Sequence, residues 1–222
     1  MIAIEEERSI KTSSSISFHP LVRIGAKIIS YVFHPLFIPV YIGWFLIYDV
    51  QLFPEQDDWH RSLLLISIFV IYTLLPLVTV LLCKALGFIQ SVFLKTQKDR
   101  IIPYVICEIF YFWGWYVSKN LSYPKELVMF ELGIFLSSCL GMMVNTYTKV
   151  SMHALSFGVV STFMVIYGLS SDDNTGFYIS IALLVSGLVC TARMITSDHK
   201  PSEIYTGLFL GIIAEVAGFL FS

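Results

Sequence analysis

Long apolar runs dominate this chain and constrain its fold more than any other feature. A hydrophobic stretch of about 20 residues is long enough to cross the hydrocarbon core of a bilayer. Seven such stretches lie at about 29–50, 62–84, 101–119, 126–146, 152–170, 176–195 and 203–221. Inside lipid a segment must satisfy its own backbone hydrogen bonds, so uninterrupted runs of this length predict helices. We therefore expect an all-α polytopic transmembrane bundle with about six to seven spans.

Composition excludes several other classes of protein. Of the 222 residues 56% are hydrophobic and only 14% are charged, which leaves no room for a separate soluble domain. The net charge of -2 argues against a nucleic-acid binder, for which a basic face is expected. The four cysteines stand singly within apolar runs, without the paired spacing of a metal site or a disulfide framework.

The chain divides into three parts by polarity. Residues 1–17 are acidic and serine-rich, and no apolar core follows a basic start, so they predict a disordered polar tail rather than a cleavable signal. Residues 18–28 carry Arg23 and Lys27 among apolar side chains, which is typical of an interfacial helix. Residues 29–222 form a single transmembrane domain.

The tetrapeptide FHPL occurs twice near the N-terminus, at 18–21 and 33–36. It is too short to count as a repeat unit. The second copy places His34 and Pro35 inside the first span, where a kink is the favoured interpretation and a ligand the less favoured one.

Three polar clusters interrupt the apolar pattern, each just before a span. They are separated by two spans from one another, so they lie on the same face of the membrane. Pro103 and Pro201 suit a first helical turn, and Ser151 suits an N-cap. Helix N-termini carry free N–H groups and partial positive charge, so three of them together predict an anion site. The clusters occupy 95–103, 147–153 and 193–203.

The side chains of these clusters suit phosphate chemistry. Guanidinium groups match phosphate oxygens in a bidentate manner, and ammonium groups add point charge. His199 and Glu203 are four residues apart and share one helical face, so the carboxylate can orient the imidazole. The cations are Lys95, Lys98, Arg100, Lys149, Arg193 and Lys200, and the second histidine is His153.

These residues resemble the signatures of the type 2 phosphatidic acid phosphatase superfamily, the lipid phosphate phosphatases. The signatures read K-x6-R-P, P-S-G-H and S-R-x5-H-x3-D. Arg193, His199 and Glu203 reproduce the third spacing, with alanine for the serine and glutamate for the aspartate. The resemblance covers roughly residues 60–222.

The other two signatures match less closely. Ser151 and His153 fall on the second, with valine for the proline and Met152 for the glycine. In the first, two isoleucines separate Arg100 from the proline, and phenylalanine stands where the lysine is expected. Lys95 or Lys98 would then replace that lysine.

The resemblance implies a membrane phosphatase of lipid metabolism, a hydrolase that acts on a lipid phosphate or polyprenyl diphosphate through a phosphohistidine. In that scheme His199 attacks phosphorus, Glu203 orients the imidazole of His199, and His153 protonates the leaving oxygen. No metal or cofactor is required. The phosphate-binding residues would be Arg193, Arg100, Lys98, Lys95 and Ser151.

Other interpretations stay open at this point. A phosphotransferase would use the same site with a second acceptor, and a non-catalytic lipid or anion binder or transporter could keep the fold after the site drifted. His153 can simply cap a helix, the lysines can simply set topology, and the acids within spans can be solvated or locally hydrogen-bonded. The expected partners are the lipid substrate and membrane lipids, with no nucleic acid; the oligomeric state is open.

Charge bias predicts the orientation. Eleven of the 14 Lys and Arg residues lie on the side of the N-terminus and the three clusters. The positive-inside rule then places that side in the cytoplasm, and we expect a bacterial inner membrane. Without the six candidate phosphate ligands, five Lys and Arg residues remain on that side against three on the other.

Overall fold

The computed structural model describes residues 18–89, 97–171, 175–196 and 199–222. Within these ranges all regular structure is helical, which confirms the all-α prediction. The predicted polar tail, 1–17, lies outside the described residues. The helices are α2 (Pro20–Val32), η1 (Pro35–Phe37), α3 (Ile38–Trp44), η2 (Phe45–Asp49), α4 (Asp58–Phe69), η3 (Val70–Leu74), α5 (Leu75–Ala85), α6 (Gln97–Asn120), α7 (Lys125–Asn145), α8 (Met152–Ser170), α9 (Gly176–Ile195) and α10 (Pro201–Phe221).

Seven helical segments of the described chain are long and apolar enough to cross a membrane, so the chain is an integral membrane protein with the predicted number of spans. Six of them begin within four residues of the predicted start, and the first begins nine residues earlier, at Pro20. They are Pro20–Asp49, Asp58–Ala85, Gln97–Asn120, Lys125–Asn145, Met152–Ser170, Gly176–Ile195 and Pro201–Phe221.

The first segment has its break later than predicted. Helix α2 passes residue 28 without interruption, ends at Val32 and packs along α9. The kink expected at His34 and Pro35 is present, because the chain leaves the α-helix there and restarts as η1. Tyr41 donates a hydrogen bond of 2.9 Å to the carbonyl of Val32, which satisfies one acceptor freed by the break. The location of α2 at the membrane interface stays a prediction.

Pro103 does not lie in the first turn of its helix, contrary to the prediction. Helix α6 is already formed at Gln97, which puts Pro103 seven residues in. A proline there deprives only the carbonyl of Asp99, four residues earlier, of its helical donor. The predictions for the other two starts are confirmed: Pro201 is the first residue of α10, and Ser151 caps α8.

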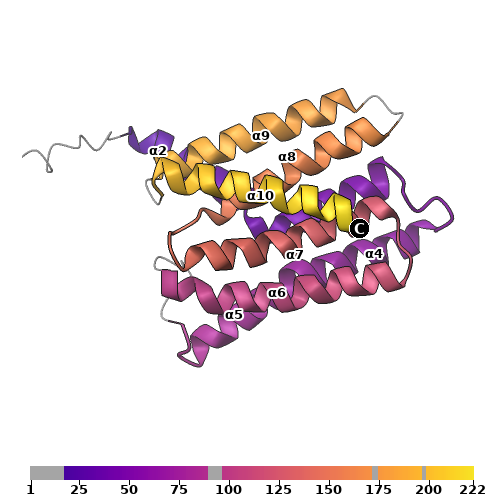
Figure 1. Cartoon of the computed structure of the whole chain (residues 1–222), viewed down its shortest axis with the longest axis horizontal. Helices are drawn as coiled ribbons and strands as arrows, with labels where there is room; N and C mark the ends of the chain where they lie inside the picture. The colour runs from indigo at the N-terminus through magenta and orange to yellow at the C-terminus, as the bar shows by residue number, and fades with distance from the viewer. Residues whose placement is uncertain (1–17, 90–96, 172–174, 197–198) are drawn as a thin grey trace, which may run out of the picture.

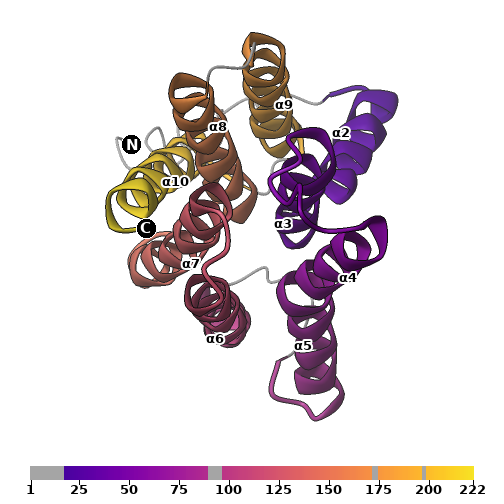
Figure 2. The same ribbon diagram turned by 90° about the vertical axis from the view of Figure 1, so that its right-hand side faces the viewer.

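The long helices run side by side. The helix ends that carry the described parts of the three polar clusters lie at the left of Figure 1, where α8 and α10 begin and α9 ends. Figure 2 shows the bundle end-on: α10 packs on α7 and α8, α6 on the other side of α7, and α2 beside α9. Helices α3, α4 and α5 complete the remaining side.

Glycines bring α8 and α10 into backbone contact. A Cβ on Gly211 would come within van der Waals overlap of the carbonyl oxygen of Leu155, and one on Gly207 would lie 2.7 Å from that of Ser151. The Gly207 and Gly211 pair therefore packs inside the bundle rather than on its surface, as its spacing indicated. This close packing carries the start of α10 directly onto the start of α8.

Two acidic side chains are buried within spans, and for Glu215 this contradicts the expectation that such acids are solvated or locally bonded. Glu131 on α7 is 3% exposed and Glu215 on α10 is fully buried. Neither carboxylate oxygen of Glu215 has a hydrogen-bond partner among the described residues. Packing against Gly133 of α7 explains the burial, because the glycine leaves room for the side chain of Glu215.

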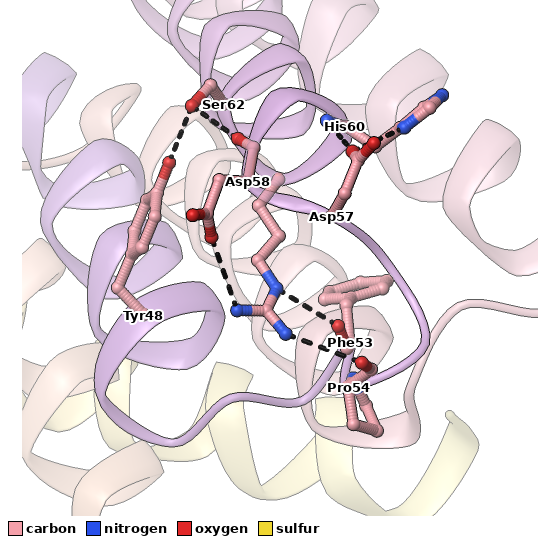
Figure 3. Close-up of polar contacts among 8 residues, drawn as sticks. Tyr48, Phe53, Pro54, Asp57, Asp58, His60 and Ser62 are labelled. Carbon is pink, nitrogen blue, oxygen red and sulfur yellow. Dashed lines mark hydrogen bonds and ion pairs between the residues drawn. The ribbon is translucent and has the colours of Figure 1, made fainter.

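The opposite end of the bundle carries a polar cap before α4 (Figure 3). Asp57 accepts a hydrogen bond of 2.8 Å from the backbone N–H of His60 and so caps the helix. That bond lowers the pKa of the Asp57 carboxyl below its ordinary value. Tyr48 and Ser62 share a hydroxyl hydrogen bond of 3.0 Å across the same loop. These contacts close the 53–62 loop and belong to the fold.

Candidate functional site

The three polar clusters meet at one end of the bundle through backbone and side-chain contacts. Arg100 of α6 donates a hydrogen bond to the carbonyl of Val150, which joins the first cluster to the second. The backbone N–H of Ser151 donates a bond of 3.2 Å to the carbonyl of Glu203, which joins the second to the third. The shared face inferred from the topology is therefore a direct contact of the described residues.

A reciprocal pair holds the start of α6 against the end of α7. The side-chain amide of Gln97 donates to the carbonyl of Asn145, and the amide of Asn145 donates to the carbonyl of Gln97, each at 2.9 Å. Arg100 follows one turn later and is 5% exposed. The pair therefore fixes the rotation of α6 that turns Arg100 into the bundle.

His199 and Glu203 are joined by a side-chain hydrogen bond. Nδ1 of His199 lies 2.9 Å from Oε2 of Glu203, and the two side chains are 2% and 14% exposed. The same oxygen accepts the backbone N–H of Lys200 at 3.3 Å, at the start of α10. Since a carboxylate accepts, Nδ1 carries the hydrogen and Nε2 keeps its lone pair.

The surroundings keep this imidazole neutral. Burial lowers the pKa of His199 to about 4, the hydrogen bond to Glu203 opposes that shift, and the charges of Arg100, Arg193 and Lys149 add to it. At neutral pH the Nε2 lone pair is therefore available, next to three cations that can neutralise a phosphate.

His153 is bound on the side of the N-terminal helix. Its Nε2 donates a hydrogen bond of 3.0 Å to the carbonyl of Ser30 on α2. Its ring meets that of His34 edge to face, with centroids 5.4 Å apart. Arg193 and His199 are both within electrostatic reach of it. His153 thus belongs to the same cluster as His199, but its Nε2 proton is held by a backbone carbonyl.

Arg193 lies at the end of α9 and acts electrostatically on both histidines. Its Nη1 donates a weak bond of 3.5 Å to the hydroxyl of Ser30, which in turn donates to the carbonyl of Ala26 at 2.9 Å. The guanidinium acts electrostatically on His34, His153 and His199. Arg193 is the cation that all three imidazoles share.

Of the two predicted lysines, only Lys98 lies within the described residues. Lys95 lies outside the described residues. Lys98 is exposed, since it is two residues from Arg100 and points to the other side of α6. Lys149, which was counted among the cations but not assigned a role, is the lysine that acts on His199.

Ser151 is fully buried and serves as the N-cap of α8, as predicted. Its hydroxyl accepts the backbone N–H of Ala154 at 3.4 Å. Met152, the departure from the glycine of the family signature, lines a cavity of about 40 Å³ with Pro35 and Tyr104 inside the bundle. The larger side chain is therefore accommodated between helices.

Ser30 and His34 were missed as site residues. Each contacts His153, and Ser30 also contacts Arg193, yet they come from a span that carries none of the motif residues. The signal that could have found them is the repeated FHPL, whose second copy contains His34.

Comparisons with models of protein families, with curated proteins and with solved structures find no match to this chain.

Proposed function

We propose that this protein is a membrane phosphatase that hydrolyses a lipid phosphate or polyprenyl diphosphate through a phosphohistidine. The observation that carries the proposal is the arrangement around His199. Its imidazole is neutral, its Nδ1–H is oriented by Glu203, and the charges of Arg100, Arg193 and Lys149 act on it. A neutral nucleophile among cations is what attack on a phosphate dianion requires.

In the first step Nε2 of His199 forms a bond to phosphorus while the bond from phosphorus to the leaving oxygen breaks. The developing imidazolium is stabilised by Glu203, and the guanidinium groups of Arg100 and Arg193 stabilise charge on the phosphoryl oxygens. In the second step His153, neutral after the first step, takes a proton from water, whose oxygen bonds to phosphorus while the nitrogen to phosphorus bond breaks. Phosphate then leaves with His199 and His153 both restored.

The leaving oxygen needs a proton, and in this proposal His153 supplies it. Because Nε2–H of His153 is bound to the carbonyl of Ser30, the transferable proton is the one on Nδ1 of the imidazolium form. A bound phosphate dianion beside Arg193 would favour this charged form, because opposite charges attract.

An apolar groove beside the site supports a lipid as substrate. It has a volume of about 190 Å³ and runs between α3, α8 and α9. It begins at Phe33, next to His34, and at Phe157, one turn after His153. A hydrocarbon chain in this groove would leave its phosphate at the histidines. Its lining includes Tyr41, Phe45, Met164 and Ile181.

The charge bias of the chain supports a site on the cytoplasmic face of a bacterial inner membrane, because most Lys and Arg residues lie on the side of the motifs. Labelling of single introduced cysteines in intact cells tests this orientation. Tyr147→Cys reports on the site face and Trp59→Cys on the opposite face, because both side chains are exposed.

The test is phosphate release by the purified protein from a panel of lipid phosphates and polyprenyl diphosphates. We expect release by the wild type, none by His199→Ala, and unchanged release by His60→Ala, whose side chain contacts the capping Asp57 at the opposite end of the bundle. A wild type that is folded, binds orthovanadate and releases no phosphate from any substrate would instead indicate an anion binder or transporter. Release that survives His199→Ala would exclude the phosphohistidine.

A further inference from the structure

The two FHPL segments fold in the same way. In each, the histidine precedes a helix whose first residue is the proline. Nδ1 of His19 accepts the backbone N–H of Leu21 at 3.3 Å, and Nδ1 of His34 accepts that of Leu36 at the same distance. In both neutral rings the hydrogen is therefore on Nε2.

The surroundings of the two histidines differ. His19 is exposed at the start of α2. His34 is partly buried, its ring lies against that of His153, and Arg193 is within electrostatic reach. A helix cap alone does not need such a location, as His19 demonstrates. His34 presents an N–H donor, oriented by its cap, beside the ring of His153 and within electrostatic reach of Arg193.

Ser30 extends the same wall of the site by one helical turn. Its carbonyl holds Nε2–H of His153, and its hydroxyl is 3.5 Å from Nη1 of Arg193. Ser30 and His34 are four residues apart, at the end of α2 and directly after it. This segment therefore contacts the proposed proton donor and the shared arginine together.

We propose that His34 is a further phosphate-binding residue, which donates Nε2–H to an oxygen of the phosphate held by Arg193, and that Ser30 is a positioning residue for His153 and Arg193. This inference rests on the proposed phosphatase function. It adds the first span to a site otherwise assembled from α6, α8, α9 and α10. The N-terminal helix is then required for substrate binding and not only for anchoring.

Ser30 is tested by removing only its hydroxyl. Ser30→Ala keeps the carbonyl that holds His153, so we expect a rise in KM of about 10-fold or less with kcat nearly unchanged. Ser30→Thr restores the hydroxyl and should restore KM. Ser67→Ala is the matched control, because Ser67 also donates to the carbonyl four residues earlier but is exposed. A purely structural role for Ser30 would give no rescue by threonine.

His34 is tested with a substitution that keeps the cap. Asparagine is a good N-cap, so His34→Asn and the matched His19→Asn should both fold, as thermal unfolding in detergent will show. The readout is the affinity for orthovanadate, measured by calorimetry without turnover. We expect about 10- to 100-fold weaker binding for His34→Asn and less than twofold change for His19→Asn.

The outcomes separate the two proposals. The role of His34 alone would be overturned if the wild type binds vanadate and releases phosphate, and His34→Asn binds vanadate with the same affinity as the wild type. A folded wild type that neither binds vanadate nor releases phosphate would overturn the proposed function, and this inference with it.

Discussion

Nδ1 of His199 lies 2.9 Å from Oε2 of Glu203, and that oxygen also accepts the backbone N–H of Lys200. The glutamate thus joins helix capping to orientation of the imidazole. A carboxylate one methylene longer than the aspartate of the family signature still reaches the ring, because the helix begins immediately before it. The start of α10 and the candidate nucleophile are built from the same contact.

Glu203→Gln separates the two roles. The amide oxygen can still accept from Lys200, but the negative charge that stabilises an imidazolium is lost. We expect kcat to fall by about 100-fold or more while the thermal unfolding temperature changes little. Single-turnover phosphate release and a melting curve on the same preparation check this. An equal loss of stability and activity would contradict it.

Stability should depend on pH through His199. Its folded pKa of about 4 is below the ordinary value of 6.5, so the unfolded chain binds this proton first as pH falls. The contribution of the neutral imidazole is therefore complete above about pH 6.5 and declines down to about pH 4. As pH is lowered through this window, the unfolding temperature should fall more steeply for wild type than for His199→Gln. Parallel curves would refute the contribution of His199 to the pH dependence of stability.

The contact of α8 with α10 should be sensitive to a single methyl group. Gly211→Ala places a Cβ against the carbonyl of Leu155, so we expect a loss of about 2 kcal/mol or more and reduced phosphate release. Gly187→Ala is the control, because nothing lies within 4 Å of its added Cβ. That change should be neutral or stabilising by up to about 1 kcal/mol. Thermal unfolding in detergent distinguishes them.

The lysine that serves the site should be Lys149 rather than Lys98. Lys149 acts on His199, whereas Lys98 is exposed on the other side of α6. We expect Lys149→Ala to raise KM several-fold and Lys98→Ala to raise it less than twofold. Lys119→Ala, at the far end of α6, controls for net charge. A larger rise in KM for Lys98→Ala than for Lys149→Ala would instead support Lys98, the lysine expected from the sequence.

Much of the fold followed from local hydrophobicity. Spans are long apolar runs because lipid satisfies no backbone group, so their number and approximate limits could be read from the chain. The parity of the spans then brought Arg100, Ser151, His153, Arg193 and His199 to one face. These statements need no knowledge of packing.

Rotation and contact could not be derived in this way. Whether Lys98 or Arg100 faces the site depends on the turn of α6, which Gln97 and Asn145 fix across the two helices. Burial of Glu215 depends on the space left by Gly133, far away in the chain. The role of Ser30 and His34 depends on the docking of α2 against α9.

The sequence by itself determined a seven-span helical membrane protein whose three cationic clusters share one face, because hydrophobic length and helix parity are local properties. Only the tertiary structure decided which side chains of those clusters meet, and added Ser30 and His34 to them. The physical reason is that side-chain direction depends on how glycines, caps and buried hydrogen bonds set each helix against its neighbours.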